Sequence, residues 1–554
     1  MAPENQVEYA SAVHAELPAF AIEHHNRLDK PEDIQRAADA QAATAKEHNM
    51  TLWQGLKLYP KAIGWSLLFS TVIIMEGYDV VLMGSFYAYP TFREKYGNLQ
   101  PDGSYELPGA WQAGISNAMN VGQIIGLFMN GFISEHLGYR KTMLGALFAT
   151  TLSIFVLFFA PSKPVLLVGE LCIGVPLGIF QTLAVTYAAE VCPVVLRAYL
   201  TTYVNLCWVI GQILGSAVLR GMLDRTDEWG YRVPFALQWI WPVPIAVGVF
   251  LAPESPWWLV RTGQVAEAKR ALGRLASKDS SVEFNVDETI AMISHTNELE
   301  KEISAGMHYT DCFTGIDLRR TEITCLTWAV QNLCGAGLMA YSTYFYKAAG
   351  LPEHQSFNMS LAQYGLGFFG TLLSWVLMTH FGRRRLYIVG LFSLFVLLMV
   401  VGFISLAPGA ARGNNVAASW ATGSVLLVYT FVYDATVGPV CYSLVSEMPS
   451  TRLRNKTIVL ARNLYNILSI VNGVIIPYML NPTEWDWAGK AGFFWAGLCF
   501  CSACWAFFRL PEPKGRTFGE LDILFEAKVP ARKFRHTKIN PFSVQGEKMA
   551  EKEE

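Results

Sequence analysis

Charged residues are scarce in this chain of 554 residues. Asp, Glu, Lys and Arg together make up 16% of it, while Ala, Val, Ile, Leu, Met, Phe, Trp, Tyr and Cys make up 52%. On the scale that omits Tyr and counts Gly, the apolar share rises to about 56%, above the roughly 45–50% of ordinary soluble chains. This excess favours a membrane protein over a large soluble core, and the net charge of −2 says nothing about partners.

The chain also lacks a disulfide framework and a signal peptide. Its ten cysteines lie mostly in or beside apolar runs and form no paired Cys-x-x-Cys sets, so we interpret them as small buried hydrophobes. We expect no metal and no cofactor. The first 61 residues are charged throughout and have no apolar core, so membrane insertion must depend on internal spans.

Twelve apolar segments are about 20 residues long, enough to cross a bilayer. They cover roughly residues 62–89, 110–134, 142–160, 164–189, 199–220, 232–252, 322–347, 357–379, 386–406, 421–445, 457–480 and 489–509. We therefore predict an all-α membrane protein with two six-helix bundles. The expected parts are an N-terminal tail 1–61, bundles 62–252 and 322–509, a central amphipathic loop 253–321 and a C-terminal tail 510–554.

The distribution of basic residues predicts the orientation. The loops 135–141, 190–198, 380–385 and 446–456 are rich in Arg and Lys, whereas the loops on the opposite side mix few bases with acids. By the positive-inside rule, both tails and the central loop are expected to be cytosolic.

The two halves of the sequence contain similar motifs at corresponding positions. "GFISEHLGYRKTM" follows the second span and "THFGRRRL" the eighth, while "AAEVCPVVLRAYL" follows the fourth and "VSEMPSTRLRNKT" the tenth. Such duplication of a six-span unit is typical of transporters built around a central cavity, and a channel or membrane enzyme does not need it.

These repeats, with "PESPWWL", "QNLCG", "GPVCYSLVSEMP" and "PEPKGRTF", resemble the sugar porter branch of the major facilitator superfamily from about residue 60 to 525. "EGYDVVLMGSFYAYPTFREKYG", "RTEITCLTWAVQNLCG" and "PARKFRHTKINPF" are similar to the fungal α-glucoside (maltose-type) proton symporters. The substrate class is implied by this resemblance alone.

Acidic residues stand inside apolar spans, where an ionised carboxylate costs several kcal/mol unless it is compensated. Glu76 and Asp79 lie three positions apart on one helix face, and Glu170 stands where the resemblance places an Arg. Three carboxylates facing one cavity cannot all be ionised cheaply, so we expect at least one to carry a proton. The alternative is that Glu76 and Asp79 mark a helix boundary and reach water.

Arg462 is the only obvious base within a span, and we predict that it is the counter-charge across the cavity. The alternative is that it lies near the cytosolic end of its span and snorkels into water. These residues, Glu76, Asp79, Glu170 and Arg462, are the expected proton-coupling group.

Sugar recognition needs neutral amides for hydroxyl groups and aromatic planes for the ring. The candidates are Asn205, Gln212, Gln331, Asn332, Tyr341, Tyr442, Tyr465 and Asn466. The resemblance implies that Gln212, Gln331 and Asn332 fill amide positions of the porter motifs. For each amide the alternative is a hydrogen bond between helices.

Charged loop residues match the cytosolic motifs of the resemblance, and we expect them to latch the bundles in the outward-open state without touching substrate. They are Glu135, Arg140, Glu190, Arg197, Glu254, Arg383, Arg384, Glu447 and Arg454.

The function implied is proton-coupled uptake of a maltose-like α-glucoside across the plasma membrane by alternating access. A facilitative uniporter for hexose or another disaccharide stays open, as does a sugar receptor that does not transport. An enzyme is not expected, because no nucleophile, metal or phosphate-loop arrangement is found. The expected partners are a small sugar, protons and the lipid bilayer, with no nucleic acid; the oligomeric state is open, with a monomer expected.

Overall fold

The computed structural model describes residues 50–101, 103–277, 285–304, 308–409, 415–450, 453–514, 516, 521, 524–535 and 537. Most of the expected N-terminal tail and the end of the C-terminal tail lie outside the described residues. Within the described ranges the regular secondary structure is helical except for one hairpin, in which β1 (Asn98–Leu99) pairs antiparallel with β2 (Tyr105–Glu106).

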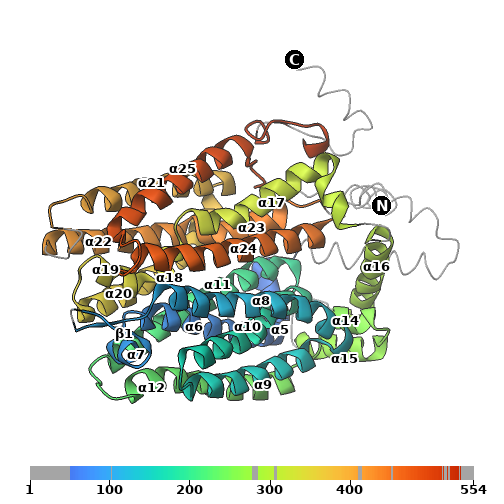
Figure 1. Ribbon diagram of the computed structural model, residues 1–554. Coiled ribbons are helices and arrows are strands. Elements are labelled where there is room, and N and C mark those ends of the chain that lie inside the picture. The colour runs from blue at the N-terminus through green and yellow to red at the C-terminus, as the bar shows by residue number, and fades with distance from the viewer. Residues whose placement is uncertain are drawn as a thin grey trace, which may run out of the picture.

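The helices form two groups (Figure 1). The first half comprises α4 (Leu52–Leu58), α5 (Pro60–Ser70), α6 (Val72–Phe86), α7 (Pro90–Tyr96), α8 (Gly109–Leu137), α9 (Tyr139–Phe158), α10 (Lys163–Val191), α11 (Val194–Met222), α12 (Trp229–Leu237), η1 (Gln238–Ile240) and α13 (Pro242–Leu251). The second half comprises α17 (Gly315–Leu333), α18 (Gly337–Ala340), α19 (Ser342–Ala348), α20 (Glu353–His380), α21 (Arg383–Ile404), α22 (Val416–Ala435), α23 (Val437–Glu447), α24 (Arg454–Leu480), η4 (Ala488–Lys490) and α25 (Ala491–Arg509).

The helices between the two halves lie at one end of the molecule. They are α14 (Pro256–Arg261), α15 (Val265–Leu275), α16 (Val286–Ser304) and η2 (Tyr309–Phe313). In Figure 1, α14, α15 and α16 lie at the right, while α7 and the hairpin lie at the opposite end. We call these the α14 end and the α7 end.

Ten helices in the described part of the chain are long and apolar enough to cross a membrane. The two other expected segments, 110–134 and 322–347, are also helical but do not meet this description. Helix α8 carries many amide side chains, which lower its hydropathy. The helix of the second segment is interrupted after α17 at Gly335, whose φ of +94° favours glycine. The expected single segment 322–347 is therefore split among α17, α18 and α19.

Apolar side chains cover the outside of the helices. On α9, Phe148, Leu152 and Phe155 are 67%, 51% and 47% exposed and follow one helix face. In water such a stripe would be a large unfavourable surface, whereas hydrocarbon chains solvate it at no cost. The packing therefore agrees with a multi-pass membrane protein.

Helices α8 and α10 approach closely through glycine. A Cβ atom on Gly126 would lie 2.0 Å from the carbonyl oxygen of Val175, and one on Gly178 would lie 2.2 Å from that of Gln123. Small residues allow backbones to approach in this way, and the resulting van der Waals contact holds membrane helices together. This contact fixes Glu170 and Gln181 of α10 beside α8.

The halves meet tightly at the α7 end. A Cβ on Gly84 of α6 would lie 2.1 Å from the carbonyl oxygen of Ala340, which follows the break in the second half. The hydroxyls of Ser85 and Thr343 are 3.0 Å apart. Tyr344 donates to Glu106 at 2.8 Å, and Glu106 also pairs with Arg93 at 2.5 Å. The α7 end is therefore closed in this conformation.

Substitution of Gly126 by Leu is expected to destabilise the fold, because the added side chain would push against the backbone of α10. Overpacking of this kind typically costs about 1–3 kcal/mol. Thermal unfolding of the purified protein in detergent would measure the loss. Gly131→Leu is the matched control on the same helix, since nothing lies within 4 Å of a Cβ at that position; equal melting temperatures for the two variants would contradict this account.

Candidate functional site

Glu76 of α6 is connected to Arg462 of α24 through one amide. The carboxylate Oε1 of Glu76 accepts hydrogen bonds from Gln181 Nε2 and, at 3.4 Å, from Gln123 Nε2. Arg462 Nη2 in turn donates to Gln181 Oε1 at 2.5 Å. Glu76 is 6% exposed. Through these hydrogen bonds the predicted acid and base are brought together across the two halves, with Gln181 between them.

Asp79 and Glu170 form a second acidic group, in which both side chains are fully buried. Asp79 Oδ1 accepts from Gln238 Nε2 at 2.8 Å. Asp79 Oδ2 and both oxygens of Glu170 have no hydrogen-bond partner among the described residues. The two carboxyl groups lie close enough for their charges to interact, so this pair lacks the compensation that Glu76 receives.

Aromatic rings surround the guanidinium of Arg462. Its central carbon lies 4.9 Å from the ring centre of Trp328 and 4.7 Å from that of Tyr465. Trp328 also meets Tyr465 and Tyr442 edge to face, at 5.4 and 5.0 Å between ring centres. Cation–π contacts stabilise a desolvated guanidinium. Arg462 therefore lies against rings of α17 and α24, and Tyr442 of α23 packs on Trp328.

Two of the predicted amides bond to neighbouring helices. Gln331 Nε2 donates to the carbonyl oxygen of Gly438 at 3.1 Å. Asn332 Nδ2 donates to the carbonyl oxygen of Tyr465 at 3.0 Å and to Ser469 Oγ at 3.1 Å. These hydrogen bonds between helices are the alternative to sugar binding that the sequence analysis left open. In this conformation both amide nitrogens already have acceptors.

The other sugar candidates have different surroundings. Asn205 Nδ2 and Asn466 Nδ2 are buried without a hydrogen-bond partner among the described residues. Gln212 is 5% exposed. Tyr341 stacks on Tyr87 with ring centres 6.1 Å apart, close to the closed α7 end.

At the α14 end, acidic side chains bind the start of α9. Glu254 accepts from the backbone N–H groups of Tyr139 at 3.1 Å and Arg140 at 3.2 Å, which begin that helix. Burial raises the pKa of the Glu254 carboxyl, and these N–H groups and that of Ser255 oppose the rise. An acid at this place satisfies otherwise free donors and interacts favourably with the helix dipole.

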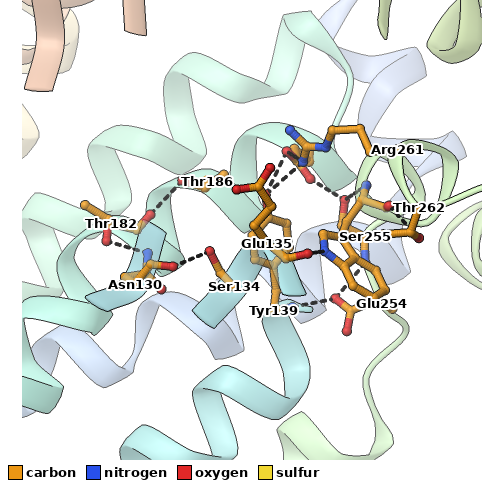
Figure 2. A network of polar contacts seen from close by, with 12 residues as sticks. Asn130, Ser134, Glu135, Tyr139, Thr182, Thr186, Glu254, Ser255, Arg261 and Thr262 are labelled. Carbon is orange, nitrogen blue, oxygen red and sulfur yellow. Dashed lines mark hydrogen bonds and ion pairs between the residues drawn. The ribbon is translucent and has the colours of Figure 1, made fainter. Parts of the chain in front are cut away.

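Glu190 of α10 joins the same network, of which Figure 2 labels Tyr139, Glu254, Ser255 and Arg261. It accepts from the hydroxyl of Tyr139 at 2.9 Å, from the hydroxyl of Ser255 and from the guanidinium of Arg261. Trp258 donates its indole N–H to the carbonyl oxygen of Glu135 at 2.9 Å. These contacts fasten α14 to α8, α9 and α10.

The second half repeats this arrangement. Glu512 accepts from the backbone N–H groups of Arg383 at 2.9 Å and Arg384 at 3.2 Å, which begin α21. The side chain of Arg383 pairs with Glu447 at 3.2 Å. The side chain of Arg197 lies outside the described residues, and Arg454 has a polar contact. The contacts described here hold each half together; a latch between the halves stays a prediction for another conformation.

Comparison with known proteins identifies the family of this chain. Residues 65–525 match the family described as Sugar (and other) transporter. The chain belongs to this family.

Two relatives of this sugar transporter come from Saccharomyces cerevisiae. A general alpha-glucoside permease (strain ATCC 204508 / S288c) is 44% identical over 514 residues, which cover 92% of this chain and 82% of that protein. Maltose permease MAL61 is 44% identical over 532 residues, covering 95% of this chain and 86% of that protein. The predicted family and the closer resemblance are confirmed.

A solved structure shows the same fold. The proton:xylose symporter XylE, bound to 6-bromo-6-deoxy-D-glucose, matches with a TM-score of 0.67 at 20% identity, over 84% of this chain and 100% of that chain. A second structure, the inward open conformation of XylE from E. coli, matches with a TM-score of 0.65, also at 20% identity, over 84% of this chain and 99% of that chain. The predicted all-helical membrane fold is thus confirmed, and at this identity these structures support the fold alone. The family match and the permease relatives confirm the prediction of a sugar transporter rather than an enzyme.

Sequence reasoning missed several side chains of the site. They are Gln123, Gln181, Gln238, Trp328 and Glu512. Two signals were available: Trp328 stands one helix turn before Gln331 and Asn332, and the Pro-Glu pair in "PEPKGRTF" repeats the one in "PESPWWL" that contains Glu254. For Gln123, Gln181 and Gln238 there was no such signal, because an isolated amide in a span has many roles.

Substitution of Glu254 by Gln is expected to destabilise this sugar transporter. One carboxylate oxygen becomes an NH₂ group that faces a backbone N–H donor, and a buried donor left without an acceptor costs about 1–3 kcal/mol. Thermal unfolding of the purified protein would show the loss. Glu267→Gln, at an exposed acid of α15, is the control; a Glu254→Gln variant as stable as this control would contradict the capping role.

Proposed function

We propose that this chain takes up an α-glucoside disaccharide such as maltose together with a proton, by alternating access across the plasma membrane. The substrate class is supported by the yeast relatives, whose names state alpha-glucoside and maltose transport. The proton is supported by the buried pair Asp79 and Glu170, on which this part of the proposal depends.

Two ionised carboxylates at this place would be expensive. Each would lie away from water, they would repel each other, and three of their four oxygens have no donor in the described part of the chain. Burial of an unpaired charge is usually avoided by neutralisation. A proton on one of the two acids removes the repulsion between them and leaves only one buried charge. This is the behaviour that a proton-coupling site requires.

The proposed transport cycle depends on the charge of this acidic pair. A proton that enters from outside neutralises one acid and favours sugar binding between the halves. The loaded carrier closes at the α7 end, opens at the α14 end and releases sugar, after which the acid loses its proton to the less acidic cytosol. Proton and sugar together stabilise the occluded form, so coupling is a shift in population.

Unpartnered donors support a polar ligand. Asn205 and Asn466 each hold a buried amide nitrogen without an acceptor in the described residues, and Trp328 holds a buried indole N–H in the same condition. Sugar hydroxyls are acceptors that could satisfy such donors. Gln212, Tyr341, Tyr442 and Tyr465 complete the proposed sugar-binding group, with Gln331 and Asn332 available only if their present bonds open.

The predicted orientation and boundaries form part of the proposal. We infer that the α14 end and both tails face the cytosol and that the carrier acts as a monomer. The bundles at 62–252 and 322–509, the central loop at 253–321 and the tails 1–61 and 510–554 remain the proposed division of the chain. In this frame Glu135, Arg140, Glu190, Arg197, Glu254, Arg383, Arg384, Glu447 and Arg454 act at the cytosolic gate.

The function is tested by expression in cells that lack sugar carriers. Entry of labelled maltose, glucose and lactose is followed beside the external pH. We expect concentrative maltose entry with alkalinisation of the medium. Downhill hexose entry that ignores the proton gradient would instead identify a uniporter, and binding without entry would identify a receptor.

Asp79→Asn and Glu170→Gln are expected to abolish concentrative uptake while sugar exchange across the membrane is retained, because the neutral side chains keep the shape of the site but cannot exchange a proton. Accumulation driven by an imposed proton gradient, compared with exchange of labelled for unlabelled maltose, separates the two steps. Undiminished accumulation in both variants would refute the role of this pair.

A further inference from the structure

Gln181 lies between an acid of the first half and a base of the second. It belongs to α10, it donates through Nε2 to Glu76 of α6, and it accepts through Oε1 from Arg462 of α24 at 2.5 Å. Gln123 of α8 donates to the same oxygen of Glu76 at 3.4 Å. One neutral amide therefore joins Glu76 to Arg462 across the two halves.

The chemistry of the three groups fixes the direction of both bonds. A guanidinium only donates and an ionised carboxylate only accepts, while an amide does one at each end. With a charge at each end the chain of bonds is charge-assisted, and each bond polarises the next. A proton on Glu76 removes one of these charges and leaves a neutral, weaker acceptor. The connection is therefore strong only while Glu76 is ionised.

The environment of Glu76 leaves few other groups that could change this connection. The titratable groups that interact with it are Asp79 on its own helix, Arg462 and Tyr465 of α24, and Tyr442 of α23. Gln123 of α8 and Gln181 of α10 are neutral. Arg and Tyr ordinarily keep their protons near neutral pH, so among the groups that interact directly with this connection only Glu76 and Asp79 can change charge.

The base at the far end is held in place independently. The guanidinium of Arg462 is packed near the rings of Trp328 and Tyr465. Arg462 stands about two turns from the start of α24 at Arg454, on the part of that helix nearer the α14 end. Weakening of the Gln181 bond would therefore loosen the halves there, while the contacts of Ser85 with Thr343 and Glu106 with Tyr344 remain at the α7 end.

We propose that Gln181 is a positioning residue that transmits the charge state of Glu76 to Arg462, so that the halves are fastened on the cytosolic side while Glu76 is ionised and released when it is protonated. This inference rests on the proposed proton-coupled transport. Removal of the Gln181 amide should therefore let the carrier open toward the cytosol whether or not a proton is bound.

The test uses the full chain reconstituted in lipid vesicles and maltose exchange as the probe, at acid and at alkaline pH. Wild-type exchange is expected to be faster at acid pH. Gln181→Met, which keeps the length of the side chain without its hydrogen bonds, is expected to reduce this acid-to-alkaline ratio about fivefold, toward unity. A merely structural role would lower both rates and preserve the ratio.

Further variants test the same connection. Glu76→Gln should flatten the pH dependence to a similar degree, and the double variant should add nothing, because both changes act on one connection. Gln123→Met removes the other amide from Glu76 but leaves the bond to Arg462, so it should change the ratio less. If Gln181→Met does not fold, Gln181→Glu replaces it: its carboxylate can still pair with Arg462, and exchange should slow at alkaline pH.

The outcomes separate this inference from the function on which it rests. Wild-type exchange and accumulation that ignore pH would refute the proposed function and the inference with it. Proton-driven accumulation in the wild type together with an unchanged pH ratio in Gln181→Met, equal effects of Gln181→Met and Gln123→Met, or additive effects in the double variant would overturn the role of Gln181 alone.

Discussion

A carboxylate in an apolar span must find compensation, and the described structure meets this requirement in two different ways. Glu76 receives donors from Gln123 and Gln181 and, through the latter, the charge of Arg462. Asp79 accepts one hydrogen bond, from Gln238, whereas neither oxygen of Glu170 has a partner among the described residues, and the charges of the two acids interact. The first arrangement compensates the acid while it is ionised, and the second leaves an ionised pair without compensation. The two groups therefore differ in how strongly their surroundings oppose a negative charge.

The general features of this site could be predicted from the sequence because they depend on residue types that are rare in a membrane. Acids and a base stand out in apolar runs, and basic loops predict orientation. Helix boundaries were harder to predict from the sequence. Helix α8 carries amide side chains that contact α10 and the second half, so hydropathy alone does not mark it as a span, and Gly335 divides a segment that hydropathy presents as continuous.

Partners of neutral side chains could not be predicted from the sequence. Gln181 is 105 residues from Glu76 and 281 residues from Arg462, and no pattern in the chain connects these positions. The same difficulty explains Gln331 and Asn332, whose amides bond to α23 and α24 in this conformation. An amide satisfies a sugar hydroxyl or a helix carbonyl equally well, so only the packing decides.

The two halves share a scaffold but not the chemistry. Glu254 binds the start of α9 and Glu512 binds the start of α21 in the same way, as expected for a duplicated unit. Glu76, Asp79 and Glu170, by contrast, all belong to the first half, and Arg462 belongs to the second. A proton held by one half can move the other only through contacts that cross between them. In the proposed mechanism, coupling therefore depends on the few side chains that connect the acids to the opposite half as well as on the acid that titrates.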